Sequence, residues 1–158
     1  MKSDPRHPIR ILFVCHGNIC RSPMAEFVFR DLVRRAGLEA SFQIASAATS
    51  REELGNPVYP PVRRLLEKHG IDCSGKTARQ VTAEDYRNYD LLIGMDRANI
   101  RNLNRICSGD PEGRIHLLLE YIHEDREVAD PWYSDDFETA WRDISAGCEG
   151  LLAALCEN

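Results

Sequence analysis

The segment that most constrains this chain is a buried strand joined to a helix by only eight residues, 15–22. Residues 9–14 are apolar and rich in β-branched side chains, which predicts a short buried strand. Ser22 and Pro23 predict a helix start, with Ser at the cap and Pro at the first helical position, where its missing N–H costs nothing. The residues between must therefore turn the chain from a strand end into a helix N-terminus.

Such a turn has the properties of a phosphate-binding loop. It gathers backbone N–H groups at the positive end of a helix dipole, which suits a dianionic phosphate. The sequence places a thiol at one end of the turn and a guanidinium six residues later, Cys15 and Arg21. A cysteine beside a helix N-terminus and an arginine is expected to be a thiolate near neutral pH. The thiolate can attack phosphorus while the arginine binds two equatorial oxygens, so these residues predict a phosphatase site.

Other interpretations of the same residues have to be weighed. A Cys-x5-Arg spacing alone often arises by chance, and Cys15, His16 and Cys20 are conceivable zinc ligands. Four residues between cysteines is not a usual zinc-finger spacing, however, and no second ligand pair follows. Gly17 and Asn18 stand where a tight or left-handed backbone is needed. Together with the strand, the helix and the serine after the arginine, they favour the phosphate loop.

Residues 15–23 resemble the signature loop of the low-molecular-weight protein tyrosine phosphatases. Further segments match the family in order, namely Ser46–Thr49, Lys68–Ile71, Ala78–Val81, Met95–Asp96 and Asp130–Tyr133. The resemblance covers residue 9 to about residue 155. It implies hydrolysis of phosphotyrosine and aryl phosphate monoesters through a cysteinyl-phosphate intermediate, with no cofactor and no metal. It also assigns substrate binding to six loop residues: His16, Gly17, Asn18, Ile19, Cys20 and Ser22.

Cleavage of a phosphate ester also needs a proton for the leaving oxygen, and the resemblance assigns that role to Asp130. Asp-Pro alone is common at turns, but Pro131 favours an extended backbone at Asp130 that would help aim the carboxyl. After the phenolate leaves, the same carboxylate is expected to activate water against the cysteinyl phosphate. Trp132 and Tyr133 match an aromatic pair that flanks the family's pocket, and Trp stands where many relatives carry Tyr.

A supporting set of polar residues is also implied by the resemblance. The matching positions of the network that braces the phosphate loop are Asn18, Ser22, Ser46 and His69. Asn18 would hold a strained backbone through its side chain, and Ser22 would stabilise the thiolate. His69 is interpreted as structural support near a helix end rather than as a catalyst. Asp96 matches a position that anchors the catalytic arginine, and it also has the place of an N-cap for a helix over 97–107.

The rest of the chain alternates strands with helices. Further strands are predicted over 42–47, 90–95 and 114–119, and helices over 23–36, 58–69, 97–107 and 136–155, with a short helical turn opening at 82–85. This pattern predicts a single-domain α/β fold, a doubly wound four-stranded parallel sheet with helices on both faces and ligand at the C-terminal strand ends. Residues 1–8 are assigned to an N-terminal extension and 9–158 to the phosphatase domain.

Composition excludes several classes of partner. The chain has 25 acidic and 20 basic residues, a net charge of −5, which argues against a general nucleic-acid binder. It shows no apolar run of membrane-spanning length and no signal-peptide apolar region in residues 1–8. Its six cysteines lack the spacing of a disulfide scaffold, and a thiolate nucleophile needs reducing conditions, so we expect a cytoplasmic protein. The expected partner is a tyrosine-phosphorylated protein, and no pattern indicates the oligomeric state.

Three positions bear on selectivity and redox behaviour. Glu52 stands where mammalian relatives carry Trp, so a carboxylate near the entrance should weaken binding of acidic phosphopeptides. The phosphoarginine-specific branch has a Thr-like residue at the position of Ile19, whose hydroxyl helps orient attack on a P–N bond. An apolar Ile19 therefore predicts phosphotyrosine as the better substrate and phosphoarginine and phosphoserine as poor ones. Cys20 either captures an oxidised Cys15 as a disulfide or fills a small buried site, and both interpretations stay open.

Three other functions share part of this pattern. Protein arginine phosphatase is the alternative, which Ile19 disfavours. A thioredoxin-coupled arsenate reductase shares the loop but needs two further cysteines near residues 80–90, and residues 82–89 contain none. A non-catalytic phosphate-binding or redox module is disfavoured because Cys15, Arg21 and Asp130 are all present.

Overall fold

A parallel four-stranded sheet in the order β2-β1-β3-β4 forms the centre of the fold. The computed structural model describes residues 4–156, so residues 1–3 of the predicted extension and 157–158 of the predicted phosphatase domain lie outside the described residues. The strands are β1 (Ile9–Cys15), β2 (Phe42–Ala48), β3 (Leu91–Gly94) and β4 (Ile115–Leu117). The chain passes from β1 to β2 on one side and later to β3 on the other. Such a reversal opens a crevice at the carboxyl ends of the strands.

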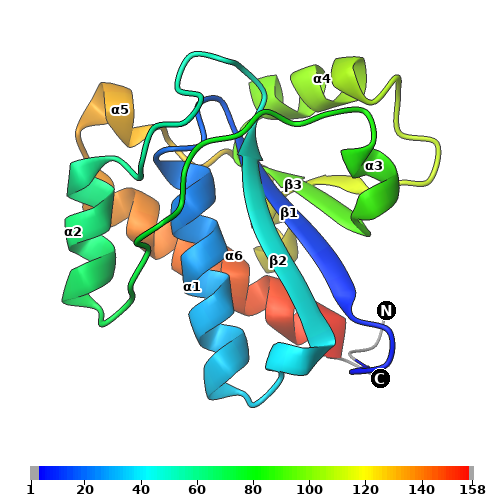
Figure 1. Ribbon diagram of the computed structural model, residues 1–158, viewed down its shortest axis with the longest axis horizontal. Coiled ribbons are helices and arrows are strands. Elements are labelled where there is room, and N and C mark those ends of the chain that lie inside the picture. The colour runs from blue at the N-terminus through cyan, green and yellow to red at the C-terminus, as the bar shows by residue number, and fades with distance from the viewer. Residues whose placement is uncertain (1–3, 157–158) are drawn as a thin grey trace.

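Helices cover both faces of this sheet (Figure 1). One face carries α1 (Arg21–Arg35), α2 (Pro60–Lys68) and α6 (Phe137–Cys156), and the other carries α3 (Asp85–Asn88) and α4 (Arg97–Ile106). The short elements are the 3-10 helices η1 (Glu39–Ser41) and η2 (Leu118–Ile122) and the single turn α5 (Pro131–Ser134). The predicted doubly wound α/β fold is therefore confirmed. None of the helices in the described part of the chain is long and apolar enough to cross a membrane.

Strand β1 is buried on both faces, and its alternate residues divide the core in two. Ile11 and Phe13 pack toward α1 and α6, whereas Leu12 and Val14 pack toward α4. All four side chains are fully buried, as expected for a central parallel strand. This burial fixes the position of Cys15, the last residue of β1, at the sheet's carboxyl edge.

The start of α1 corrects one sequence prediction. The helix begins at Arg21 rather than at Pro23, and its N-cap is Cys20, which makes no side-chain capping bond. Ser22 is thus the second helical residue. Its hydroxyl lies 3.0 Å from Cys15 Sγ and also accepts from Asn18 Nδ2 at 2.8 Å, so it contacts the loop instead of capping the helix.

The fourth strand is shorter than the predicted 114–119. It ends at Leu117, whose N–H donates to Glu120 Oε1 at 3.1 Å, and the chain continues as η2. Leu118 is apolar because it packs against α6 rather than because it pairs in the sheet. A Cβ placed on Gly147 of α6 would lie only 2.6 Å from Leu118 Cγ, so the helix approaches as closely as it does because that residue is glycine. The turn α5 was not predicted either.

Candidate active site

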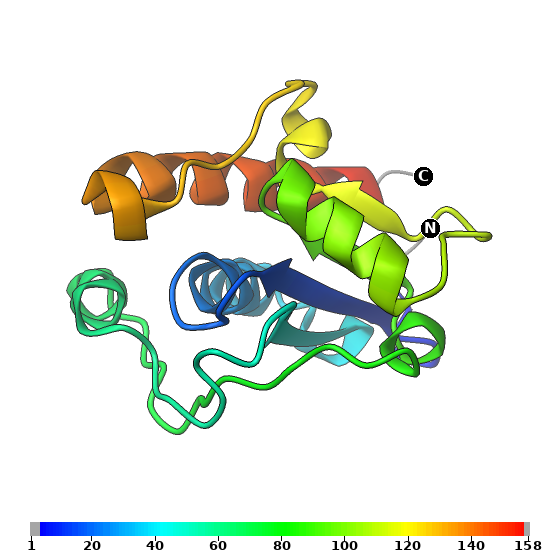
Figure 2. The same ribbon diagram turned by 90° about the horizontal axis from the view of Figure 1, so that it is seen from above.

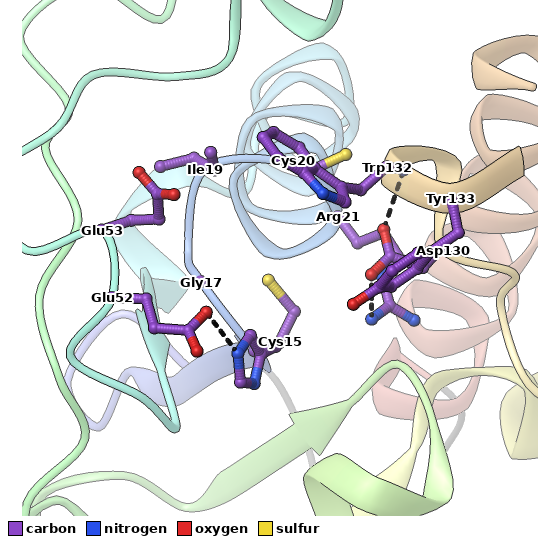
Figure 3. A pocket seen from close by; sticks show the side chains of 11 residues that line it. Cys15, Gly17, Ile19, Cys20, Arg21, Glu52, Glu53, Asp130, Trp132 and Tyr133 are labelled. Atoms are coloured by element: carbon purple, nitrogen blue, oxygen red, sulfur yellow. Dashed lines mark hydrogen bonds and ion pairs between the residues drawn. The ribbon is translucent and has the colours of Figure 1, made fainter. Parts of the chain in front are cut away.

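A cavity opens at the carboxyl end of β1, lined by residues of the loops after β1 and β2 and of the turn α5 (Figure 3). Its lining contains both predicted reactive side chains, the predicted general acid and the predicted aromatic pair. The full set is Cys15, His16, Gly17, Ile19, Cys20, Arg21, Glu52, Glu53, Asp130, Trp132 and Tyr133. This is the crevice position that the strand order predicts.

The sulfur of Cys15 is surrounded by hydrogen-bond donors. Cys15 is 3% exposed, and the backbone N–H groups of Asn18 and Ser22 both donate to Sγ at 3.4 Å. The Ser22 hydroxyl lies closer, at 3.0 Å. Donors directed at one sulfur stabilise negative charge on it, which is what a thiolate nucleophile requires.

Asn18 holds the loop in shape. Its φ of 60° lies in the left-handed region, so of the two residues predicted to need a tight or left-handed backbone, Asn18 is left-handed and Gly17 is not. The buried Asn18 amide donates to Ser22 Oγ at 2.8 Å and to Ser46 Oγ at 2.9 Å, and its carbonyl accepts from Arg79 N at 3.2 Å. These bonds offset the strain of the backbone, so three of the four predicted supporting residues lie together.

The network continues into two residues that sequence reasoning missed. Ser46 Oγ donates to Glu26 Oε1 at 2.6 Å, and Lys76 Nζ donates to the Ser46 carbonyl at 2.8 Å and lies 3.7 Å from the same Glu26 oxygen. Burial lowers the pKa of Lys76, an effect that the neighbouring Glu26 opposes. The available signal was Glu26 itself, an acidic residue on the buried side of α1. Lys76 carries no local sign of its contact.

His69 does not join this network, contrary to the prediction. It is the exposed C-cap of α2, and its ring stacks on Trp141 of α6 with ring centroids 4.1 Å apart. Among the described residues Lys76, not His69, contacts Ser46. The prediction was wrong because matching a family motif places His69 in the sequence but does not show what its side chain contacts. The fold of the chain after α2 brings Lys76, not His69, to Ser46.

Arg21 is buried and faces two carboxylates from distant loops. Its Nη2 lies 2.9 Å from Asp96 Oδ2 and 3.4 Å from Asp130 Oδ2, and its Nη1 donates to the Val128 carbonyl at 2.8 Å. Burial alone would lower the pKa of Arg21, but the charges of Cys15, Asp130 and Asp96 raise it overall. Asp96 also accepts from Asn99 N at 2.8 Å as the N-cap of α4, so both contacts predicted for it are present.

Asp130 occupies the N-cap of α5, with the extended backbone expected before a proline. Its Oδ1 accepts from Trp132 N at 3.0 Å, while Oδ2 faces Arg21 (Figure 3). These two contacts orient the carboxyl toward the cavity. Trp132 and Tyr133 follow directly and are 53% and 85% exposed, so they form a rim rather than a wall of the core.

The opposite rim is acidic. The Glu52 carboxylate lies 2.8 Å from His16 Nε2, and both side chains are exposed (Figure 3). Glu53 lies against Gly17, where an added Cβ would come within 3.3 Å of Glu53 Cγ. A carboxylate at the entrance was predicted from Glu52. The structure adds Glu53, which no sequence pattern indicated, and shows that His16 contacts Glu52.

Ile19 and Cys20 complete the lining and are 8% and 6% exposed. Burial raises the pKa of Cys20 far above its usual range, so Cys20 is a neutral thiol beside Cys15. Disulfide formation between them stays a prediction. Within residues 4–156, no three His, Cys, Asp or Glu side chains are grouped as they would be to hold a metal ion.

A buried cysteine and arginine on a strand–loop–helix turn, faced by an aspartate, define the class of phosphatases that use a cysteine nucleophile. The family model for low molecular weight phosphotyrosine protein phosphatase matches residues 10–158, and the chain belongs to this family.

Sequence relatives and solved structures agree with this assignment. The low molecular weight protein-tyrosine-phosphatase YfkJ of Bacillus subtilis is 40% identical over 149 residues, covering 93% of this chain and 96% of that protein. The human low molecular weight phosphotyrosine protein phosphatase is 40% identical over 147 residues, covering 90% and 92%. The crystal structure of YfkJ matches with a TM-score of 0.90 at 41% identity, covering 93% of this chain and 94% of that chain. DARP, a Drosophila arginine phosphatase, matches with a TM-score of 0.87 at 28% identity, covering 95% and 99%.

Proposed function

We propose that this cavity hydrolyses phosphotyrosine in proteins, with Cys15 as nucleophile, Arg21 as the clamp on the phosphoryl group and Asp130 as general acid and base. The observation that carries the proposal is that a donor-surrounded thiol, a buried guanidinium and an oriented carboxyl line one cavity. The expected partner is a tyrosine-phosphorylated protein. We place the reaction in the cytoplasm because a thiolate nucleophile needs reducing conditions.

In the first step the thiolate of Cys15 attacks phosphorus. The S–P bond forms as the bond from phosphorus to the phenolic oxygen breaks, and Asp130 gives its proton to that oxygen. Arg21 binds two equatorial oxygens through its planar fork and stabilises their charge in the transition state. Its contacts with Asp96 and Val128 hold the guanidinium in place for this purpose.

In the second step water hydrolyses the cysteinyl phosphate. Asp130, now a carboxylate, takes a proton from the water as it attacks phosphorus. The S–P bond breaks, phosphate leaves, and the negative charge returns to the Cys15 sulfur. The donors from Asn18 and Ser22 stabilise that charge, so the same contacts favour both the start and the end of the cycle.

Depth and rim support an aromatic substrate. The thiol lies on the cavity floor, whereas Trp132 and Tyr133 stand exposed at the entrance, where a phenyl ring can stack. A phosphoserine side chain is too short to bring its phosphate to such a floor. Arginine phosphatase stays the alternative, because DARP shares the fold and an aromatic rim can also stack on a guanidinium.

The deciding experiment is turnover of p-nitrophenyl phosphate by the wild type and by Cys15→Ser. The variant should lose turnover while it still binds vanadate, because the oxyanion cradle is built from backbone N–H groups and Arg21. Metal-dependent turnover that survives Cys15→Ser would overturn the mechanism.

A further inference from the structure

Tyr59 is fixed to the phosphate loop although it does not line the cavity. Its backbone N–H donates to the Ile19 carbonyl at 2.8 Å. Its own carbonyl accepts from Val62 N at 2.9 Å and Arg63 N at 3.0 Å, because Tyr59 is the N-cap of α2. Hydrogen bonds to both the phosphate loop and α2 therefore fix the backbone of Tyr59, and this restricts where its ring can lie.

The ring of Tyr59 reaches the segment that carries the general acid. Its centroid lies 5.0 Å from that of Trp132, at an interplanar angle of 51°, and 6.1 Å from that of Phe137 at the start of α6. Trp132 N in turn donates to Asp130 Oδ1. Contacts thus run without a gap from the Ile19 carbonyl through Tyr59 and Trp132 to Asp130. Figure 2 shows α2 in green below the orange segment that contains α5, with the blue loop after β1 beside them.

A second connection joins the same two loops, and it depends on charge. Arg21 contacts Asp130 at 3.4 Å and the Val128 carbonyl at 2.8 Å. In the first step of the reaction Asp130 must carry a proton and Arg21 must bind the phosphoryl oxygens, so the ion pair between them is weakened when the position of Asp130 matters most. The contact between Tyr59 and Trp132 involves no charge and is the same in both steps.

We propose that Tyr59 is a positioning residue that holds Asp130 at the height of the leaving oxygen through its ring contact with Trp132. The inference rests on the general-acid role proposed for Asp130. Small displacements of an acid group from the atom it protonates produce large losses of rate. No hydrogen bond of the Tyr59 hydroxyl is present within the described residues, so the ring alone carries the effect.

The test uses two substrates that differ in their need for a proton. Phenyl phosphate releases a phenol whose pKa resembles that of tyrosine, about 10, whereas p-nitrophenyl phosphate releases a more acidic phenol. The quantity compared is kcat/KM, which reports the steps through departure of the leaving group. Tyr59→Leu should lower kcat/KM about tenfold on phenyl phosphate and less than about threefold on p-nitrophenyl phosphate. Tyr59→Phe, the matched control, should keep both values within about twofold of the wild type.

The variant Asp130→Asn distinguishes a failure of the inference about Tyr59 from a failure of the general-acid role proposed for Asp130. If that variant shows no difference between the two substrates, the general-acid role itself fails. If Asp130→Asn shows the difference but Tyr59→Leu loses both activities equally, or loses neither, the inference about Tyr59 is wrong. In the double variant, kcat/KM on phenyl phosphate should equal that of Asp130→Asn within about twofold, because two residues that act through one group are not additive.

If Tyr59→Leu fails to fold, a second variant tests the same ring contact. Trp132→Leu removes the same contact from its other side, at a residue that is 53% exposed. It should raise KM for both substrates because Trp132 lines the entrance, but the loss of kcat/KM should again be larger on phenyl phosphate. Equal losses on the two substrates would contradict the proposal.

Discussion

The floor and the rim of the cavity differ in burial and in the number of hydrogen bonds that hold their side chains. Cys15 and Arg21 on the floor are 3% and 2% exposed, and each is held by several hydrogen bonds. Trp132 and Tyr133 at the rim are 53% and 85% exposed, and the Glu52 carboxylate has one exposed contact, with His16. The floor is thus the more firmly held part, and in the proposed function it binds the group common to all substrates, a phosphoryl. The rim is solvated and meets the part in which substrates differ.

The contrast predicts its largest effect for Arg21→Lys. An ammonium cannot reproduce the planar fork that binds two oxygens, so kcat/KM for p-nitrophenyl phosphate should fall by about 10³-fold or more. Because the floor contacts only the phosphoryl group, the loss should be similar for phosphotyrosine peptides. Thermal unfolding provides the control. The Tm of the variant should stay close to that of the wild type, since lysine keeps a positive charge beside Asp96. A loss below tenfold would show that the fork is not needed.

Asp130→Asn should have the next largest effect. Removing one acid–base group should lower kcat/KM for phosphotyrosine by about 10²–10⁴-fold. Asp130 lies between floor and rim, so its loss should depend on the leaving group and be smallest for acidic phenols. A matched control is Asp135→Asn, an exposed carboxylate just beyond α5 and outside the cavity lining. An unchanged rate on phosphotyrosine would exclude the assignment.

Most of the floor was predictable because it is local. Residues 16–20 join the end of β1 at Cys15 to the start of α1 at Arg21, so the loop's short length and the buried strand before it fix where these two residues lie. Sequence-based reasoning failed where a contact joins distant segments. Lys76 contacts Ser46, 30 residues earlier, without any pattern around it. For Ser22 the capping role was wrong, whereas the resemblance correctly implied its contact with the Cys15 sulfur and its place in a network with Asn18.

The rim was predictable in composition but not in its contacts. Glu52, Trp132 and Tyr133 were placed at the entrance by resemblance to a family. The ring contact between Tyr59 and Trp132 depends on how two loops pack, and neither loop has a period that indicates it. His69 shows the same limit, since its stacking on Trp141 is a tertiary contact between two helices. Local patterns indicate which residues a site contains more readily than which of them touch.

The preference for phosphotyrosine over other phospho-amino acids should be an effect of intermediate size, and it tests the floor and the rim together. We expect kcat/KM for a phosphotyrosine peptide to exceed that for matched phosphoarginine and phosphoserine peptides by about tenfold or more. Ile19 offers a methyl surface instead of a hydroxyl to help attack on a P–N bond, and the aromatic rim suits a phenyl ring. The comparison needs identical flanking residues. Equal or faster turnover of phosphoarginine would overturn the argument from Ile19, and Ile19→Thr should shift the ratio toward phosphoarginine.

The smallest effect is expected at the acidic rim. Glu52 is exposed, so its interaction with a charged substrate residue should be about 0.2–1 kcal/mol, or up to about fivefold in kcat/KM. The wild type should prefer a phosphotyrosine peptide with Lys beside the phosphotyrosine over one with Glu, and Glu52→Gln should reduce that ratio about two- to fivefold at low salt. High salt should reduce the ratio in the wild type as well, because screening weakens exposed charges. Arg51→Gln, which removes a positive charge from the adjacent exposed position, is the matched control and should move the ratio in the opposite direction. If Glu52→Gln leaves the ratio unchanged, the charge of Glu52 does not contribute to peptide preference. Shape alone would then distinguish substrates at the rim.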